Sequence, residues 1–267
     1  MIARKELARM KENILSSGKD LDMTRREKFK KTMSRLTSAQ FLKPFLFLNL
    51  ILNIGLEWAG FPALAFYMHT ILHQLRIPLD EYWVAVGLAG YRSCLTLGLS
   101  FVLYKVRRRP VYLLAGSLVC LATASLSAYN WIIPHLDQDT RDSISFLPLV
   151  SVILMYTGFG IGYGPIVFIL QGELLPSDMR SLGSGLLGVL DNISLFIAVK
   201  TVPTIIAGVG MEGAYLLYSC CCLANLVISF FVMPETKGLS LEDIEDLYRD
   251  KDKQVIQHKR RFSGTYL

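Results

Sequence analysis

The chain has 267 residues, 52% of them apolar, and a formal net charge of +6 at pH 7. Its charges crowd into residues 1–43, 105–109 and 235–261, whereas a soluble helical domain spreads polar residues along one face of every helix. The distribution therefore argues against a soluble protein. The five cysteines all fall inside apolar stretches and lack metal-ligand spacing, which argues against a disulfide framework or a cysteine metal site.

Long apolar stretches dominate the chain after its first segment. Residues 1–43 are polar and basic, with helical stripes such as Leu7, Met10 and Ile14. Six stretches of at least 20 residues follow, each long enough for a helix to cross about 30 Å of hydrocarbon. They are residues 45–72, 83–104, 111–133, 146–171, 182–207 and 214–233. Because a run of this length satisfies its backbone in lipid only as a helix, the sequence predicts an all-α integral membrane bundle of six transmembrane helices.

The end of the chain is polar and basic again. The stretch "SLEDIEDLY" at residues 240–248 has capping-box spacing and an apolar stripe, and it predicts a second cytoplasmic amphipathic helix. The predicted organisation is a cytoplasmic basic helical segment at 1–43, a six-helix transmembrane domain at 44–234 and a cytoplasmic carboxy-terminal tail at 235–267.

Lysine and arginine set the predicted orientation. With the amino-terminal segment inside, 24 of the 28 basic residues lie on the inner side, and only Arg76 and Arg141 lie outside. Basic residues mark the cytoplasmic side. We therefore expect a multi-pass protein of the cell membrane with both termini cytoplasmic. Contact with anionic lipid accounts for the basic segments, so no nucleic-acid partner is expected.

One motif matches the glycine pattern of a nucleotide-binding site but lacks the strand that should precede it. "GSGLLG" at residues 183–188 fits G-x-G-x-x-G, but that motif needs a preceding strand, and an apolar helix surrounds it here. Small residues that allow close helix packing explain it better. No cofactor, no metal and no enzymatic activity are expected.

Four charged residues lie inside the apolar stretches, namely Glu57, Arg92, Asp191 and Lys200. Intramembrane charges are costly, face the bundle interior and usually pair. Because Glu57, Arg92 and Asp191 sit near the centres of their stretches, the sequence predicts that Arg92 points into the bundle, within ion-pair reach of Glu57 or Asp191. Contact with a solute and proton coupling through one of the carboxylates are the alternatives.

Three further stretches carry a family resemblance. They are "GFGIGYGPIVFILQGELLPSDMR" (158–180), "YKVRRRP" (104–110) and "PETKG" (234–238). The alternating glycines and Pro165 in the first are expected to loosen a helix at membrane depth. Together the three resemble the sugar-porter branch of the major facilitator superfamily. "TSAQFLKPFL" and "FIAVKT" look similar to invertebrate trehalose and hexose transporters.

The resemblance covers only the second half of such a transporter, whose complete form has twelve helices in two halves with sugar bound between them. It implies transport of a trehalose- or hexose-like sugar by alternating access. The chain would then be a half-transporter or a fragment that needs an amino-terminal six-helix half or a second chain. The alternatives are a non-transporting half that binds and modulates an intact relative, and a carrier of a charged organic solute.

The family pattern also places candidate site residues. In "LEWAG" the amides usual in the family are replaced by Leu56 and Glu57, a departure from ordinary hexose recognition, because a hydroxyl-binding site depends on its polar partners. The expected substrate-binding residues are Glu57, Tyr67, Arg92, Phe168, Asp191 and Asn192. The expected cytoplasmic gating charges are Arg108, Arg109, Glu173, Arg180 and Glu235.

Overall fold

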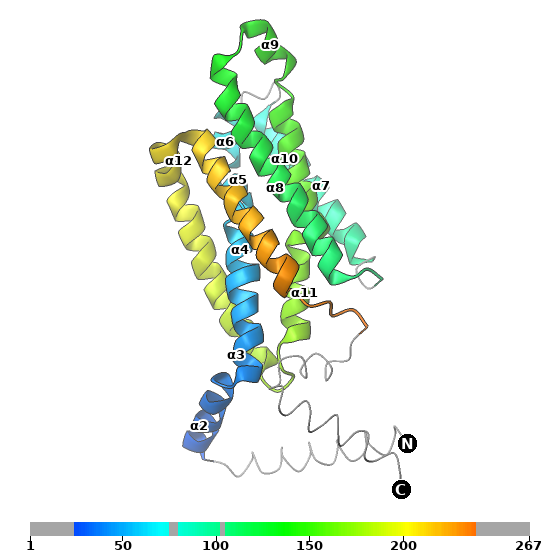
Figure 1. Ribbon diagram of the computed structural model, residues 1–267, viewed down its shortest axis with the longest axis vertical. Helices are drawn as coiled ribbons and strands as arrows, with labels where there is room; N and C mark the ends of the chain where they lie inside the picture. The colour runs from blue at the N-terminus through cyan, green and yellow to red at the C-terminus, as the bar shows by residue number, and fades with distance from the viewer. Residues whose placement is uncertain (1–23, 75–79, 102–104, 239–267) are drawn as a thin grey trace.

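The computed structural model describes residues 24–74, 80–101 and 105–238, and every regular element in these ranges is a helix (Figure 1). The α-helices are α2 (Arg25–Leu36), α3 (Ala39–Leu46), α4 (Ile54–Glu57), α5 (Phe61–Phe66), α6 (Met68–Gln74), α7 (Glu81–Ser100), α8 (Arg108–Ile132), α9 (Gln138–Ser143), α10 (Leu147–Gly158), α11 (Pro165–Leu174) and α12 (Arg180–Val232). Two π-helices, η1 (Phe47–Asn53) and η3 (Phe159–Tyr163), and the 3-10 helix η2 (Ile133–His135) complete the order. The helices predicted around Leu7 and at 240–248 lie outside the described residues.

The first apolar stretch is divided into short elements rather than forming one helix. α3 passes through the π-helical η1 into α4, and the chain then turns at Trp58–Gly60 before α5 and α6. Gly60 has a φ of 87°, a region that glycine adopts without strain. A Cβ there would also lie 3.0 Å from the Tyr218 side chain. The turn therefore depends on glycine for both its conformation and its packing.

The glycine-rich stretch before Pro165 is loosened as predicted. α10 runs into η3, and α11 begins at Pro165, which lacks the N–H that a continuous α-helix would use there. α8 differs, because it continues as an α-helix for 25 residues.

α12 consists of two arms that meet at Gly210, whose φ of 72° and ψ of 177° are not helical. We call Arg180–Gly208 the first arm and the residues after Gly210 the second arm. Figure 1 shows them joined at one end of the bundle. Among the described residues, three helical stretches are long and apolar enough to cross a membrane: Arg108–His135, Leu147–Leu174 and Arg180–Val232.

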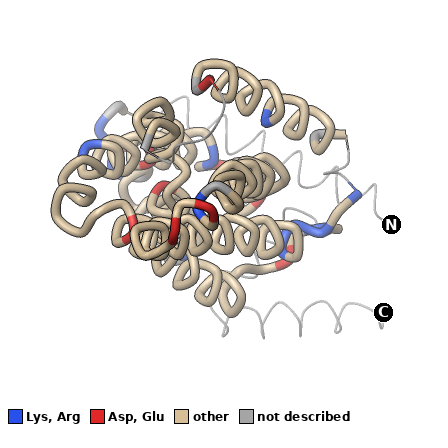
Figure 2. Tube along the Cα trace, turned by 90° about the horizontal axis from the view of Figure 1, so that it is seen from above, with Lys and Arg blue, Asp and Glu red and all other residues tan. Residues whose placement is uncertain are grey.

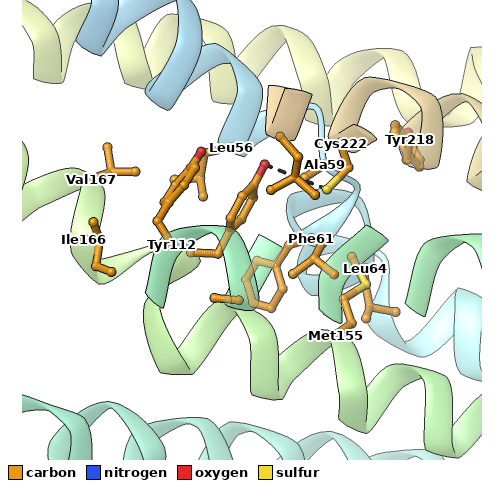
Figure 3. Close-up of a cluster of buried hydrophobic side chains, with 14 of the residues drawn as sticks. Leu56, Ala59, Phe61, Leu64, Tyr112, Met155, Ile166, Val167, Tyr218 and Cys222 are labelled. Atoms are coloured by element: carbon orange, nitrogen blue, oxygen red, sulfur yellow. Dashed lines mark hydrogen bonds between the residues drawn. The ribbon is translucent and has the colours of Figure 1, made fainter. Parts of the chain in front are cut away.

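The core forms around α8, which packs mainly against α12 and α10. Leu56, Ala59 and Phe61 of the divided first stretch meet Tyr112 of α8 and Cys222 of the second arm in Figure 3, and all five are buried. The short elements α4 and α5 are thus held by packing between longer helices, since helices of this length are not stable alone.

α2 lies at the end of the bundle where α3 begins and α11 ends (Figure 1). Only Thr37 and Ser38 separate it from α3, and an ion pair between Arg35 and Asp178 joins it to the turn before α12. The view from above in Figure 2 shows few charged positions along the bundle helices.

Candidate functional site

Glu57 is a buried carboxylate at the end of α4. The residue is only 8% exposed, and its Oε2 atom has no hydrogen-bond partner in the part of the chain that the structure describes. The helix ends at this residue because the chain turns through Trp58 towards Gly60. A buried charged group without a partner costs free energy. The fold therefore keeps a buried carboxylate oxygen that no hydrogen bond among the described residues uses.

Asp191, on the first arm of α12, is the charged group that acts electrostatically on Glu57. It is partly buried, and its negative charge repels that of Glu57 rather than neutralising it. Within the part of the chain that the structure describes, no ion pair joins Arg92 or Lys200 to either carboxylate. The predicted ion pair of Arg92 is therefore wrong.

Arg92 contacts aromatic rings in place of a carboxylate. Its guanidinium carbon lies 4.9 Å from the ring centroids of both Phe61 and Phe159, which stack on each other 3.7 Å apart. A guanidinium at this range gains a cation–π attraction. The side chain thus leans on α5 and η3 while the residue stays exposed. Glu57, Arg92 and Asp191 lie near the centres of their apolar stretches, but this similar depth does not place Arg92 next to either carboxylate.

Tyr67 and Asn192 both make contacts on the first arm. The Tyr67 hydroxyl donates to the Val199 carbonyl at 3.3 Å, and the Asn192 amide donates to the Gly188 carbonyl of its own helix at 2.7 Å. An open hollow along this arm is lined by Gly185, Gly188, Val189, Asn192, Ile193 and Phe196. The structure thus brings Glu57, Asp191 and Tyr67 to the arm that carries the hollow.

Phe168, the remaining predicted substrate residue, lies on α11 and is 61% exposed. Near it in the chain is a polar contact that sequence reasoning missed. The buried Gln171 donates from Nε2 to Oδ1 of the buried Asn53 at 3.2 Å. The other amide atom of Asn53, Nδ2, is buried without a hydrogen-bond partner among the described residues. No local spacing in the sequence signals this contact, because its two residues lie 118 positions apart.

A second missed polar cluster lies within the core. The hydroxyls of Tyr112 and Tyr163 both donate to Oδ1 of Asn225, at 2.8 and 3.2 Å, and the two rings stack with centroids 5.0 Å apart. A Cβ on Gly55 would lie 1.7 Å from Nδ2 of Asn225, so only glycine lets the two segments approach this closely. The cluster connects α8, η3 and the second arm.

Three of the five predicted gating charges meet at one end of the bundle. Arg108 donates from Nη2 to Oε1 of Glu173 at 3.0 Å, and its backbone N–H donates to Oε1 of Glu235 at 3.0 Å. The other oxygen of Glu173 accepts the Thr236 hydroxyl at 2.6 Å. These contacts tie the start of α8 to the end of α11 and to the segment after α12.

The other two gating candidates stand outside this cluster. Arg109 donates to the Phe230 carbonyl and lies 5.4 Å from the centroid of the Phe230 ring. Arg180 donates to the Leu175 carbonyl at 3.4 Å, and its Nε atom is buried without a hydrogen-bond partner within the described ranges. Both arginines therefore bind nearby backbone rather than a carboxylate.

The sequence and the helical bundle have counterparts among known proteins. The family described as "Sugar (and other) transporter" matches residues 2–248, well over half of the chain. The chain belongs to this family. It is therefore a membrane protein from a family of transporters rather than of enzymes, and the resemblance stated from its motifs is confirmed.

The relatives include trehalose transporters of insects. The chain is 29% identical to facilitated trehalose transporter Tret1 of Bombyx mori over 238 residues, which cover 87% of this chain and 46% of that protein. It is 26% identical to the Tret1 of Culex quinquefasciatus over 204 residues, 76% of this chain and 39% of that protein. The chain spans about half the length of the curated relatives it matches.

A solved structure shares the fold. The inward-open conformation of the xylose transporter XylE from E. coli superposes with a TM-score of 0.66 at 16% identity, covering 84% of this chain and 46% of that one. The arrangement of helices is thus that of about half of a major facilitator transporter.

Proposed function

We propose that this chain forms one half of a facilitative sugar transporter, which carries a trehalose- or hexose-like sugar by alternating access. The family match across residues 2–248 carries the proposal, and the relatives named as facilitated trehalose transporters support the sugar class. In this view the first arm of α12 lines one wall of the solute path. A six-helix amino-terminal half or a second chain supplies the other wall.

The proposed solute contacts are the six predicted site residues, of which Asn192 lines the hollow and Glu57 has a buried oxygen without a hydrogen-bond partner among the described residues. Glu57 and Asp191 offer acceptors, and Asn192 and Tyr67 offer amide and hydroxyl groups. Phe168 offers an exposed ring for an apolar sugar face, and Arg92 offers donors. Sugars bind through such hydrogen bonds and ring contacts, with a few polar groups fixing orientation.

The cluster of Arg108, Glu173 and Glu235 is proposed as part of the cytoplasmic gate. Its contacts connect three segments at one end of the bundle. Charge-assisted hydrogen bonds of this kind break only at a cost, so they favour the closed arrangement. Arg109 and Arg180 would act through the backbone carbonyls that they bind.

We propose six membrane crossings with both termini cytoplasmic in the cell membrane, and domain limits at 1–43, 44–234 and 235–267. The divided first stretch, α7, α8, the α10–α11 segment and the two arms of α12 would be the six crossings. The excess of lysine and arginine in the inner segments supports this orientation.

Labelling with a membrane-impermeant thiol reagent on intact cells tests the orientation. Asp137, in the exposed connection beside α9, should react when replaced by cysteine, because it lies outside. Lys251→Cys should react only after permeabilisation, which serves as the control for reactivity. Labelling of Lys251→Cys on intact cells together with protection of Asp137→Cys would reverse the orientation.

Uptake of radiolabelled trehalose and glucose into proteoliposomes tests the activity. The 267-residue chain alone should show no saturable uptake, because six helices leave half of the solute path open. The longest natural product that contains this sequence should show saturable uptake if it adds six further helices. Saturable uptake by the monomeric 267-residue chain, with crosslinking used to exclude dimers, would refute the half-transporter proposal. A longest natural product that holds only these six helices and shows no uptake would favour a half that modulates an intact relative.

A charged organic solute is a second candidate, favoured by the charges of the site. Arg92 and Glu57 make no ion pair among the described residues, so an anionic or cationic group on a solute would find a complementary charge. Competition of organic anions and cations against sugar in the same uptake assay separates the two substrate classes.

A further inference from the structure

The helix α2 exposes two stripes of opposite character side by side. Phe29 and Met33, one turn apart, are 67% and 46% exposed. Arg26 and Lys30, also one turn apart, are exposed too. At 100° per residue the two pairs fall next to each other on the same side of the helix. This pattern of apolar side chains beside basic ones is that of helices lying in a membrane surface.

The composition of α2 strengthens the pattern. Among its twelve residues are six lysines and arginines and a single acidic residue, Glu27. The Glu27 carboxylate accepts the backbone N–H of Thr24 at 2.9 Å, so it caps the helix start. One carboxylate cannot balance six basic residues. The helix therefore presents a strong positive potential to whatever covers its apolar stripe.

The position of α2 places it beside the proposed membrane surface. Only Thr37 and Ser38 separate it from α3, and the first membrane crossing is proposed to begin just after Lys43. The ion pair of Arg35 with Asp178 holds the opposite side of the helix against the turn before α12. Arg35 lies roughly half a turn away from Arg26 and Met33. The exposed stripes thus point away from this anchored side.

We propose that α2 is an interfacial helix that binds anionic phospholipid, with Phe29 and Met33 entering the acyl boundary and Arg26 and Lys30 contacting the phosphate and carboxylate oxygens of the headgroups. The charge complementarity between this basic helix and the anionic inner leaflet selects lipid as the occupant. The long stems of arginine and lysine let their charges stay at headgroup level while the neighbouring apolar side chains are buried.

The inference rests on the proposed membrane entry after Lys43, and it does not depend on sugar transport. Because Arg35 and Asp178 connect α2 to the start of the first arm, lipid bound at α2 would also hold the cytoplasmic end of that arm. Bound lipid would thereby act on the same element that carries the hollow.

Amide hydrogen exchange of the full chain in nanodiscs tests the proposal. Peptides covering Arg25–Leu36 should exchange about tenfold more slowly in nanodiscs containing phosphatidylserine than in nanodiscs of phosphatidylcholine alone. Each basic residue near an anionic surface contributes about fivefold in binding. Two such residues together account for about 25-fold, which exceeds the expected tenfold difference, so the double variant Arg26→Gln with Lys30→Gln should show the same exchange in both lipids.

A matched control removes two positive charges elsewhere. Arg141→Gln with Lys200→Gln has the same net charge as the double variant and should keep the full lipid dependence. Raising the salt concentration should abolish the protection in the unchanged chain, which provides a measurement independent of any variant. Equal exchange of the Arg25–Leu36 peptides in both lipids would overturn the proposal. If that equal exchange is also slow, the helix is covered by another segment of the chain, such as residues 1–23, and not by anionic lipid. Both leaflets of the nanodisc have the same composition and no uptake is measured, so failure of the orientation or of transport does not affect the result.

Discussion

Replacement of Asn225 by leucine is expected to destabilise the folded chain by about 2–4 kcal/mol. Asn225 is 5% exposed, and its Oδ1 accepts the hydroxyls of both Tyr112 and Tyr163. Leucine would leave two buried hydroxyls without this acceptor, and each such loss costs about 1–3 kcal/mol. The midpoint of thermal unfolding in detergent should fall by roughly 10 °C for a chain of this size.

Two further variants make that test specific. Tyr112→Phe removes one donor but leaves Asn225 bound to Tyr163, so its midpoint should fall much less. Gly55→Ala should also be strongly destabilising, because its Cβ would lie 1.7 Å from Nδ2 of Asn225. Adding Asn225→Ala to Gly55→Ala should recover part of the loss by making room. A Gly55→Ala chain as stable as the unchanged one would show that the two segments are not in close contact.

In contrast to Asn225→Leu, replacement of Glu57 by glutamine is expected to raise the free energy of unfolding, by about 2 kcal/mol. Insertion scales assign about 2.5–3.5 kcal/mol to an acidic or basic residue at the membrane centre. Since Oε2 of Glu57 has no hydrogen-bond partner and Glu57 makes no ion pair among the described residues, the fold offsets little of that cost. Thermal unfolding of Glu57→Gln in detergent should therefore show a higher midpoint.

The same measurement tests the absence of an ion pair at Arg92. The effect of Glu57→Gln should be the same, within about 0.5 kcal/mol, in the unchanged chain and in Arg92→Leu, as it is for sites without a shared contact. Asp191→Asn should likewise add independently to Arg92→Leu. Coupling of several kcal/mol between Arg92 and either carboxylate would restore the ion pair that the sequence predicted, because removing one partner of a buried pair exposes the other to its full cost.

Apolar length and charge distribution were enough to predict the helical class, since it follows from local composition. The family motifs were enough to name Arg108 and Glu173 as gating candidates, but their contact was found only in the structure. The helix faces on which the intramembrane charged residues lie could not be predicted in the same way. The π-helical η1 and the turn at Trp58–Gly60 change the helical phase just before and after Glu57. Counting at 3.6 residues per turn cannot then tell which neighbour Glu57 meets.

The clusters found only in the structure depend on distant segments. Asn225 is 113 residues from Tyr112 in the chain, and Gln171 is 118 residues from Asn53. Neither distance leaves a periodic signal in one stretch. Arg92 shows a related difficulty, because its choice of the Phe61 and Phe159 rings depends on how α5 and η3 pack together.

The two π-helical turns determine where the bundle can bend. A π-turn widens the helix and departs from the regular hydrogen-bond pattern, so it resists bending less than an α-helical turn. η1 packs against α11 and the long α12, whereas η3 packs against α8, which runs without interruption for 25 residues. α8 is therefore suited to stay rigid, while the first stretch and the α10–α11 segment bend at their π-helical turns beside it. One end of the bundle can then change shape while the other keeps its packing.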